Sequence, residues 1–195
     1  KDIKMTIQIE KIHHVAYRCK DAKETVQWYK KNLNMDFILA FAEDYVPSTK
    51  AFDPYMHLFL NAGNGNVLAF FELPTQPEMG RDENTPKWVQ HIALKVKDRQ
   101  ALIEAKAHLE GNGVDVLGIT NHGIFHSIYF FDPNGHRLEL AYDDEKAPQK
   151  IAMITEEMKY EMLEQWSMTK RAPSHTHFLH AEELKNDSNE AKMGN

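Results

Sequence analysis

The fold is decided by the stretch Ser127-Ile-Tyr-Phe-Phe-Asp-Pro-Asn-Gly-His-Arg-Leu-Glu-Leu-Ala-Tyr142. Two apolar runs rich in β-forming residues flank Asp132-Pro-Asn-Gly135, where proline suits the second position of a turn and glycine supplies a positive φ. The pattern predicts a β-hairpin. If the strands pair directly outside the turn, Tyr129 lies opposite Glu139 on the same face. A carboxylate on a mostly apolar strand must face water or have a strong partner, which makes Glu139 a candidate site residue.

An internal repeat extends this hairpin into a fold. His14-Val-Ala-Tyr-Arg-Cys-Lys-Asp21 aligns without gaps on His91-Ile-Ala-Leu-Lys-Val-Lys-Asp98, and each stretch ends at a helix N-cap. In both halves a strand and a helix precede three further strands. The repeat predicts an α+β fold of two tandem βαβββ modules. The first module covers residues 6–74 and the second covers residues 88–143, with a polar, turn-rich linker over residues 75–87.

The residues that follow the second module belong to neither repeat. Apolar side chains recur at the spacing of one helical face, which predicts a helix over residues 149–171. Because that face must be covered, we expect a homodimer in which the helix is buried. The polar tail over residues 174–195 is expected to be mobile. The apolar residues of the predicted helix are Ile151, Ile154, Met158, Met162 and Trp166.

Composition limits the classes of function. A chain of 195 residues with 42% hydrophobic content can bury a sizeable core. The net charge of −6 and the absence of a basic stripe argue against nucleic acid as a partner. No apolar run approaches membrane-spanning length and no charged start precedes an apolar signal region, so no membrane partner is expected. The single cysteine, Cys19, excludes an internal disulfide framework and predicts a reducing, cytoplasmic location.

Matched positions in the two repeats carry candidate metal ligands. His14 and His91 open their modules, and Glu72 and Glu139 lie on the last strands. Two duplicated sheets that curve toward each other would bring these four side chains to a common centre. Imidazole and carboxylate ligands suit Fe(II), Mn(II), Zn(II), Ni(II) or Co(II). His13 competes with its neighbour, but the alignment with His91 favours His14.

The sequence resembles the vicinal oxygen chelate superfamily, which includes glyoxalase I, methylmalonyl-CoA epimerase, extradiol dioxygenases and the fosfomycin and bleomycin resistance proteins. The resemblance covers residues 10–143 and rests on His13-His14-Val-Ala, Gln90-His91-Ile-Ala-Leu-Lys-Val and Asp132-Pro-Asn-Gly-His-Arg-Leu-Glu139. It implies paired βαβββ modules that form a curved mixed sheet around a divalent metal. The ligands that it implies are His14, His91 and Glu139.

Two readings of Glu72 stay open. The glyoxalase and epimerase branches take a fourth ligand from the last strand of the first module, where Glu72 lies. Aligning Gly65 with Gly135 places Ala69 at the inward position, and Glu72 has the opposite parity. The polar turn before this strand is nevertheless long enough to shift the register by one residue. Glu72 is therefore a possible fourth ligand or base.

The resemblance to the dioxygenase branch has further marks. That branch places a tyrosine ten residues before the ligand glutamate, as Tyr129 precedes Glu139. It also has a His-Gly pair ahead of that strand, which His122-Gly123 supplies, with His126 as a rival. Such groups would hydrogen-bond a bound catecholate and the oxygen at the metal.

The leading prediction is an Fe(II) extradiol-type dioxygenase that cleaves the ring of a small, catechol-like aromatic, with Tyr129 and His122 as catalytic groups. One departure from that branch is the absence of a histidine between His57 and His91, where its distal acid–base histidine should lie. The alternative is a glyoxalase- or epimerase-like lyase or isomerase that uses Glu72 and needs no O₂. A third class is a resistance protein that binds an antibiotic without turnover.

Overall fold

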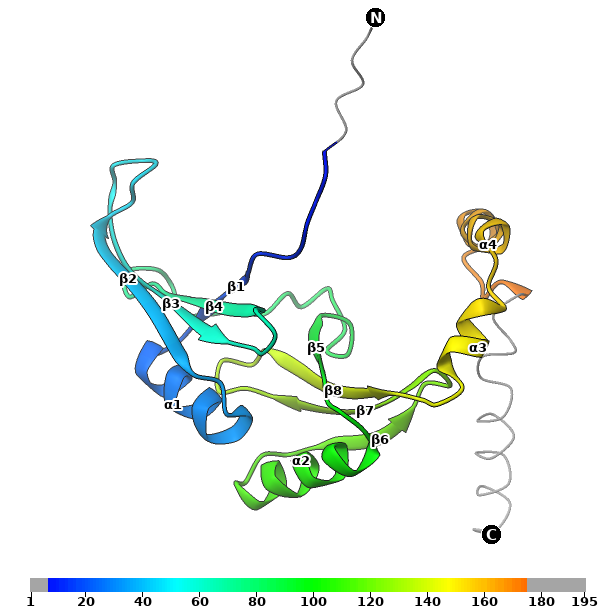
Figure 1. The fold of residues 1–195 in the computed structure, drawn as a ribbon. Coiled ribbons are helices and arrows are strands. Elements are labelled where there is room, and N and C mark those ends of the chain that lie inside the picture. Colours follow the sequence, from blue (N-terminus) through cyan, green and yellow to red (C-terminus); the bar gives the residue numbers. More distant parts are fainter. Residues whose placement is uncertain (1–6, 175–195) are drawn as a thin grey trace, which may run out of the picture. The chain divides into compact units, whose positions relative to one another are not determined.

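The computed structural model describes residues 7–174, and these form two compact units (Figure 1). The first unit contains the residues up to Gln90 together with Phe131–Arg137. The second contains His91–Phe130 and the residues from Leu138 onward. The turn of the hairpin therefore belongs to the first unit, although most of both its strands belong to the second. The predicted mobile tail lies, apart from its first residue, outside the described residues.

The first unit has the predicted βαβββ order. Its strands form a sheet in the order β1-β4-β3-β2, in which β1 is parallel to β4 and the other pairs are antiparallel. The N-cap Asp21 starts the helix by accepting a hydrogen bond from the Glu24 amide at 2.7 Å. The elements are β1 (Val15–Cys19), α1 (Ala22–Leu33), β2 (Phe37–Tyr45), β3 (Phe52–Asn61) and β4 (Val67–Glu72).

The two faces of this sheet differ in character. On one face α1 packs through Tyr29, whose ring centroid lies 5.1 Å from that of Phe70. Buried leucines of β3 and β4 fill the rest of this face. Residues of the opposite parity, such as Phe71 and its register partner His57, lie on the other face. The sequence pattern thus separates an apolar core face from a face that carries aromatic and imidazole rings.

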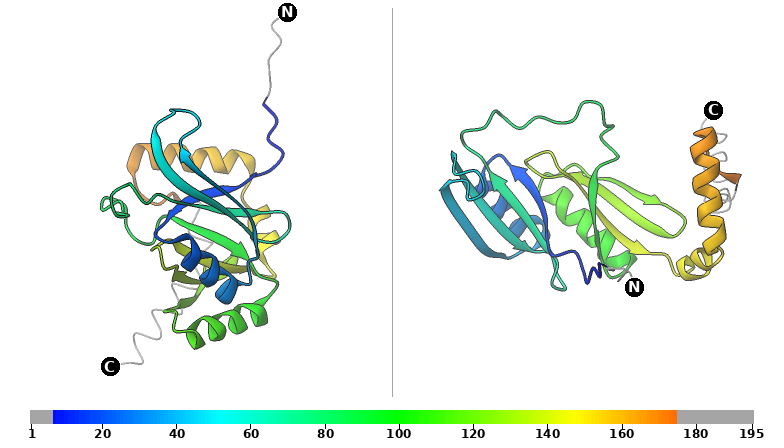
Figure 2. Two further views of the ribbon diagram at one scale, coloured as in Figure 1. Left: turned by 90° about the vertical axis from the view of Figure 1, so that its left-hand side faces the viewer. Right: turned by 90° about the horizontal axis from the view of Figure 1, so that it is seen from above.

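The second unit repeats the same order, which confirms the predicted pair of modules. Its sheet has the order β5-β8-β7-β6, which is labelled in Figure 1 and drawn from two further sides in Figure 2. The register between β6 and β7 shifts near Gly118. This glycine has a φ of +106°, and a Cβ atom added to it would lie 2.7 Å from Ser127 O, so no other residue fits at this position. The elements are β5 (His91–Lys95), α2 (Arg99–Gly111), β6 (Leu117–Asn121), β7 (Phe125–Phe131) and β8 (Arg137–Asp143).

The prediction of a single helix over residues 149–171 was wrong. Two helices, α3 (Ala147–Ala152) and α4 (Glu156–Thr169), occupy this segment. The break arises because Thr155 adopts an extended conformation and caps α4, accepting a hydrogen bond from the Met158 amide at 3.2 Å. Two glutamates in the first turn of α4 also favour a new start at this point. No helix within residues 7–174 is long and apolar enough to cross a membrane.

Candidate functional site

The second unit brings two predicted ligands together. His91 is the first residue of β5, and Glu139 lies on the neighbouring strand β8. The Nε2 atom of His91 lies 2.8 Å from Oε2 of Glu139. The glutamate side chain is buried, whereas the imidazole is 30% exposed. One nitrogen and one oxygen on rigid adjacent strands therefore meet at the edge of the protein interior.

Ser127 holds the second oxygen of the same carboxylate. Its hydroxyl donates a hydrogen bond to Oε1 of Glu139, and the serine is fully buried on β7. Each carboxylate oxygen thus has a partner, as a buried carboxylate requires. The sequence reasoning missed Ser127. The available signal was its spacing of two residues from Tyr129, which puts both side chains on the face that carries Glu139.

The predicted catalytic pair also meets. The Nε2 atom of His122 lies 2.8 Å from the hydroxyl oxygen of Tyr129. The Tyr129 ring is buried and approaches His91 edge-on, with the two ring centroids 5.9 Å apart. His122 is half-buried at the turn between β6 and β7. Within the His122–Tyr129 pair, Tyr129 is therefore the buried member beside His91, and His122 is the member that solvent can reach.

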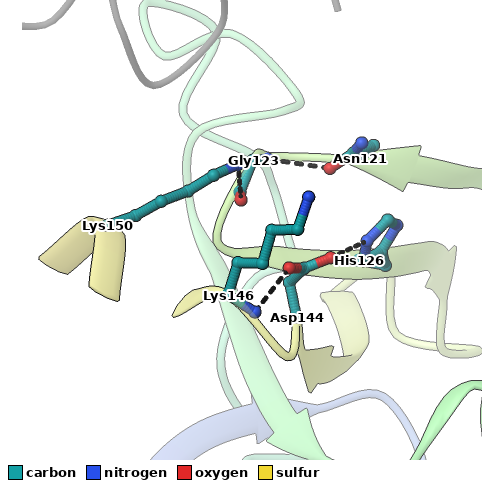
Figure 3. A network of polar contacts seen from close by, with 6 residues as sticks. All are labelled: Asn121, Gly123, His126, Asp144, Lys146 and Lys150. Carbon is teal, nitrogen blue, oxygen red and sulfur yellow. Dashed lines mark hydrogen bonds and ion pairs between the residues drawn. The ribbon is translucent and has the colours of Figure 1, made fainter. Parts of the chain in front are cut away.

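His126, the rival of His122, is engaged elsewhere. Its Nε2 atom lies 3.1 Å from Oδ2 of Asp144 (Figure 3), and its ring stacks on Tyr142 with an interplanar angle of 6°. The hydrogen bond from the Lys146 amide and then that from His126 lower the pKa of Asp144. These contacts give His126 a structural partner on the strand end rather than a place beside Tyr129.

His14 lies in the first unit, immediately before β1 rather than inside it. Its Nδ1 atom is 2.8 Å from Nδ1 of His13. Its ring centroid lies 5.9 Å from Phe59 and 6.2 Å from His57, so the imidazole adjoins the aromatic face of the first sheet. The role of His14 as a third ligand stays a prediction.

His57 was not singled out as a functional residue by the sequence. Its ring stacks on Phe71 at a centroid distance of 3.6 Å, and Phe59 lies 4.3 Å away. Its Nε2 atom is buried and has no hydrogen-bond partner among the described residues. Burial, and to a lesser degree the charge of His14, lower the pKa of the His57 imidazole. The first unit therefore holds an unsatisfied nitrogen on the same face as a ligand candidate.

Glu72 is turned toward α1. Its Oε2 atom accepts a hydrogen bond from the amide of Ala22 at 2.6 Å, in the first turn of the helix. It pairs in register with Cys19 and has the parity of Phe70, which packs against α1. This position gives the carboxylate a helix-capping partner and places it on the opposite face from His57.

A divalent metal fits the donor atoms of the second unit. Two cis ligands at about 2.1 Å from one ion lie about 3 Å apart. The 2.8 Å separation of His91 Nε2 and Glu139 Oε2 therefore needs little change to hold a metal. Within neither unit do the described residues gather three or more His, Cys, Asp or Glu side chains for one ion. His91 and Glu139 thus supply two positions of a coordination sphere that needs a further ligand.

Comparison with known proteins identifies the family. Residues 11–140 match the model of the Glyoxalase/Bleomycin resistance protein/Dioxygenase superfamily. The chain belongs to this superfamily. Its members are mostly enzymes, and they bind divalent metals and small-molecule substrates.

One superfamily relative among curated proteins is the "Putative ring-cleaving dioxygenase MhqA" of Bacillus subtilis (strain 168). It is 29% identical over 161 residues, which cover 79% of this chain and 48% of the relative. The chain therefore spans about half the length of this protein.

Solved structures of the superfamily share the fold. A glyoxylase/bleomycin resistance protein/dioxygenase domain from Frankia sp. EAN1pec superposes with a TM-score of 0.57 at 17% identity, covering 71% of this chain and 95% of that domain. The fosfomycin resistance protein FosX from Listeria monocytogenes gives a TM-score of 0.51 at 18% identity, covering 72% of this chain and 98% of that protein. These similarities establish the architecture of paired modules.

Proposed function

We propose that this protein is an Fe(II)-dependent extradiol-type dioxygenase that opens the ring of a catechol-like aromatic compound. The observation that carries the proposal is the arrangement of the second unit, where the His91–Glu139 pair adjoins the His122–Tyr129 pair. Superfamily membership and the similarity to a protein named as a ring-cleaving dioxygenase support it.

Three side chains would hold the metal. His91 would bind through Nε2 and Glu139 through Oε2, because Ser127 already occupies the other carboxylate oxygen. His14 of the first unit is the proposed third ligand, matched to His91 by the internal repeat. A bound Fe(II) ion supplies Lewis acidity toward the two substrate oxygens and a redox centre for O₂.

Tyr129 and His122 would hydrogen-bond the substrate and transfer protons. The phenol hydroxyl is held by the His122 imidazole at 2.8 Å, and the phenol ring meets the edge of His91. A substrate hydroxyl placed beside His91 would therefore lie next to a hydrogen-bonded phenol. Because His122 is half-buried, it could pass a proton between the buried phenol and the solvent.

Oxygen consumption by the Fe(II)-loaded protein tests this proposal. With a catechol as substrate, we expect O₂ uptake and a coloured ring-opened product. Tyr129→Phe should slow turnover ~10²–10⁴-fold, the usual loss for a proton-transfer group, while metal content stays unchanged. Tyr142→Phe is the matched control, because that ring stacks on His126 outside the pair. Turnover that continues without O₂ would contradict the proposal.

The lyase or isomerase alternative makes the opposite prediction. It requires Glu72 as ligand or base, so Glu72→Gln would abolish activity and Tyr129→Phe would have a mild effect. It also expects Ni(II), Co(II) or Zn(II) to support turnover without O₂. The hydrogen bond from Ala22 to the Glu72 carboxylate favours the dioxygenase. Assaying both variants with both substrate classes, with and without O₂, separates the two functions.

A further inference from the structure

Hydrogen bonds within the β6–β7 turn hold the backbone around His122, and one carbonyl of the turn binds a residue outside it. The His122 amide donates to Phe125 O at 2.8 Å, and the Gly123 amide donates to the Asn121 side chain at 2.8 Å. Gly123 has a φ of +79°, a conformation that glycine adopts without strain. Its carbonyl oxygen accepts a hydrogen bond from Nζ of Lys150 at 2.6 Å (Figure 3).

The segment that carries Lys150 is fixed to the same region at a second point. The Asp144 amide donates to Ile124 O at 2.9 Å, directly after β8 ends. The Asp144 carboxylate binds His126 on β7 and accepts the Lys146 amide at 2.9 Å (Figure 3). These contacts set the start of α3, so Lys150, one turn into the helix, reaches Gly123 from a defined position.

We propose that Lys150 is a positioning residue of the active site and that α3 holds the turn in which His122 lies. The ammonium-to-carbonyl bond is charge-assisted, a class about twice as strong as a neutral hydrogen bond. Gly123 follows His122 directly, so fixing its carbonyl restricts the turn and keeps His122 Nε2 at 2.8 Å from Tyr129. The catalytic consequence rests on the proposed function, whereas the effect on the His122–Tyr129 pair does not.

Three variants of the full chain test this inference. Lys150→Met removes the donor and keeps the apolar part of the side chain, and Lys150→Arg restores a charged donor. Lys146→Met is the matched control, since Lys146 contacts Asp144 through its backbone amide. The measurement that needs no turnover is the ¹H–¹⁵N NMR spectrum of the histidine rings, with the His122 signal assigned from a His122→Gln sample.

Lys150→Met should shift or broaden the His122 ring signal, and Lys150→Arg and Lys146→Met should leave it near its wild-type position. In the oxygen-uptake assay, Lys150→Met should lower kcat ~10–100-fold with little change in KM, the range for a group that orients a site residue. A His122 signal unchanged in Lys150→Met overturns the inference. A shifted signal in a protein that shows no dioxygenase activity overturns the proposed function and leaves the positioning role standing.

Discussion

At the scale of single residues, the carboxylate of Glu139 depends on its serine partner. Ser127→Ala would leave one oxygen of a buried carboxylate without a hydrogen bond. We expect metal affinity to fall ~10–100-fold, as for other outer-sphere partners of metal ligands. The metal-free protein should also lose about 1–3 kcal/mol of unfolding free energy. Metal titration and urea unfolding measure the two effects, and affinity equal to wild type would show that Ser127 does not orient the carboxylate.

Replacing His57 is expected to raise the free energy of unfolding, in contrast to Ser127→Ala. His57→Phe keeps the stacking on Phe71 and removes the buried nitrogen that lacks a partner. The variant should gain about 1 kcal/mol, the lower end of the penalty for an unsatisfied buried group. Because the folded protein lowers the pKa of this histidine below its ordinary 6.5, wild-type stability should fall as pH drops below 6.5.

Urea unfolding of metal-free protein at acidic and neutral pH tests this prediction. The gain from His57→Phe should be larger in the acidic sample. His108→Gln, at an exposed position of α2, controls for the loss of a histidine. A variant that loses stability at both pH values would mean that the nitrogen has a stabilising partner.

A repeat and a fixed spacing in the sequence pointed to residues that lie close together in the structure, while their roles at a site stay predictions. The alignment of the two modules and the ten-residue spacing led to His91, Glu139 and Tyr129, which the structure brings together. Ser127 and Lys150 were not predicted, because a sequence does not show which hydroxyl or amine group will reach a given oxygen atom. The sequence left the role of Glu72 open, because the polar turn before β4 made the register of that strand uncertain. In the structure the register turns Glu72 toward α1.

At the scale of elements, the turn of the hairpin is anchored to α1 within the first unit. The Tyr29 hydroxyl donates to Asp132 Oδ2 at 2.9 Å, and both residues are buried. Asn134 extends the contact by donating to the Thr25 hydroxyl at 3.1 Å. The sequence predicted the turn and the helix separately, but their association depends on side chains more than one hundred positions apart.

Tyr29 should make the fold sensitive to alkali. Burial, and then the negative charge of Asp132, raise the pKa of Tyr29 well above its ordinary value of 10.0. The folded state therefore favours the neutral phenol, and its stabilising contribution is lost as pH rises above 10. Tyr29→Phe should be less stable at neutral pH by about 1–3 kcal/mol and should lose less stability on alkaline titration. Unfolding followed at pH values from neutral to about 11 would show parallel curves if Tyr29 had no such role.

At the scale of the whole molecule, α4 exposes an apolar surface that a second copy of the chain could cover. None of its residues is buried, and Leu163 and Trp166 are 63% and 50% exposed. A helix of this length gains most of its stability from packing of its apolar face. The predicted homodimer would supply such packing. The sequence predicted one apolar helical face but missed the break at Thr155, which caps α4. A sequence also does not reveal where a packing partner comes from.

Sedimentation analysis of the variant Leu163→Glu/Trp166→Glu tests the predicted dimer. The variant should sediment as a monomer where the wild-type protein sediments as a dimer, because two carboxylates cannot be buried cheaply in an apolar contact. Glu157→Gln, in the first turn of α4, is the control and should remain dimeric. A wild-type protein that is monomeric at all concentrations would contradict the prediction.

The central proposal is that His14, His91 and Glu139 would together hold one divalent metal. Anaerobic titration with Fe(II), followed by dialysis against a chelator and metal analysis, tests it most directly. The wild-type protein should retain one ion per chain, while His14→Ala, His91→Ala and Glu139→Gln should each lose it, with Lys146→Met as a neutral control. Full metal occupancy in both His14→Ala and His91→Ala after dialysis would contradict the claim.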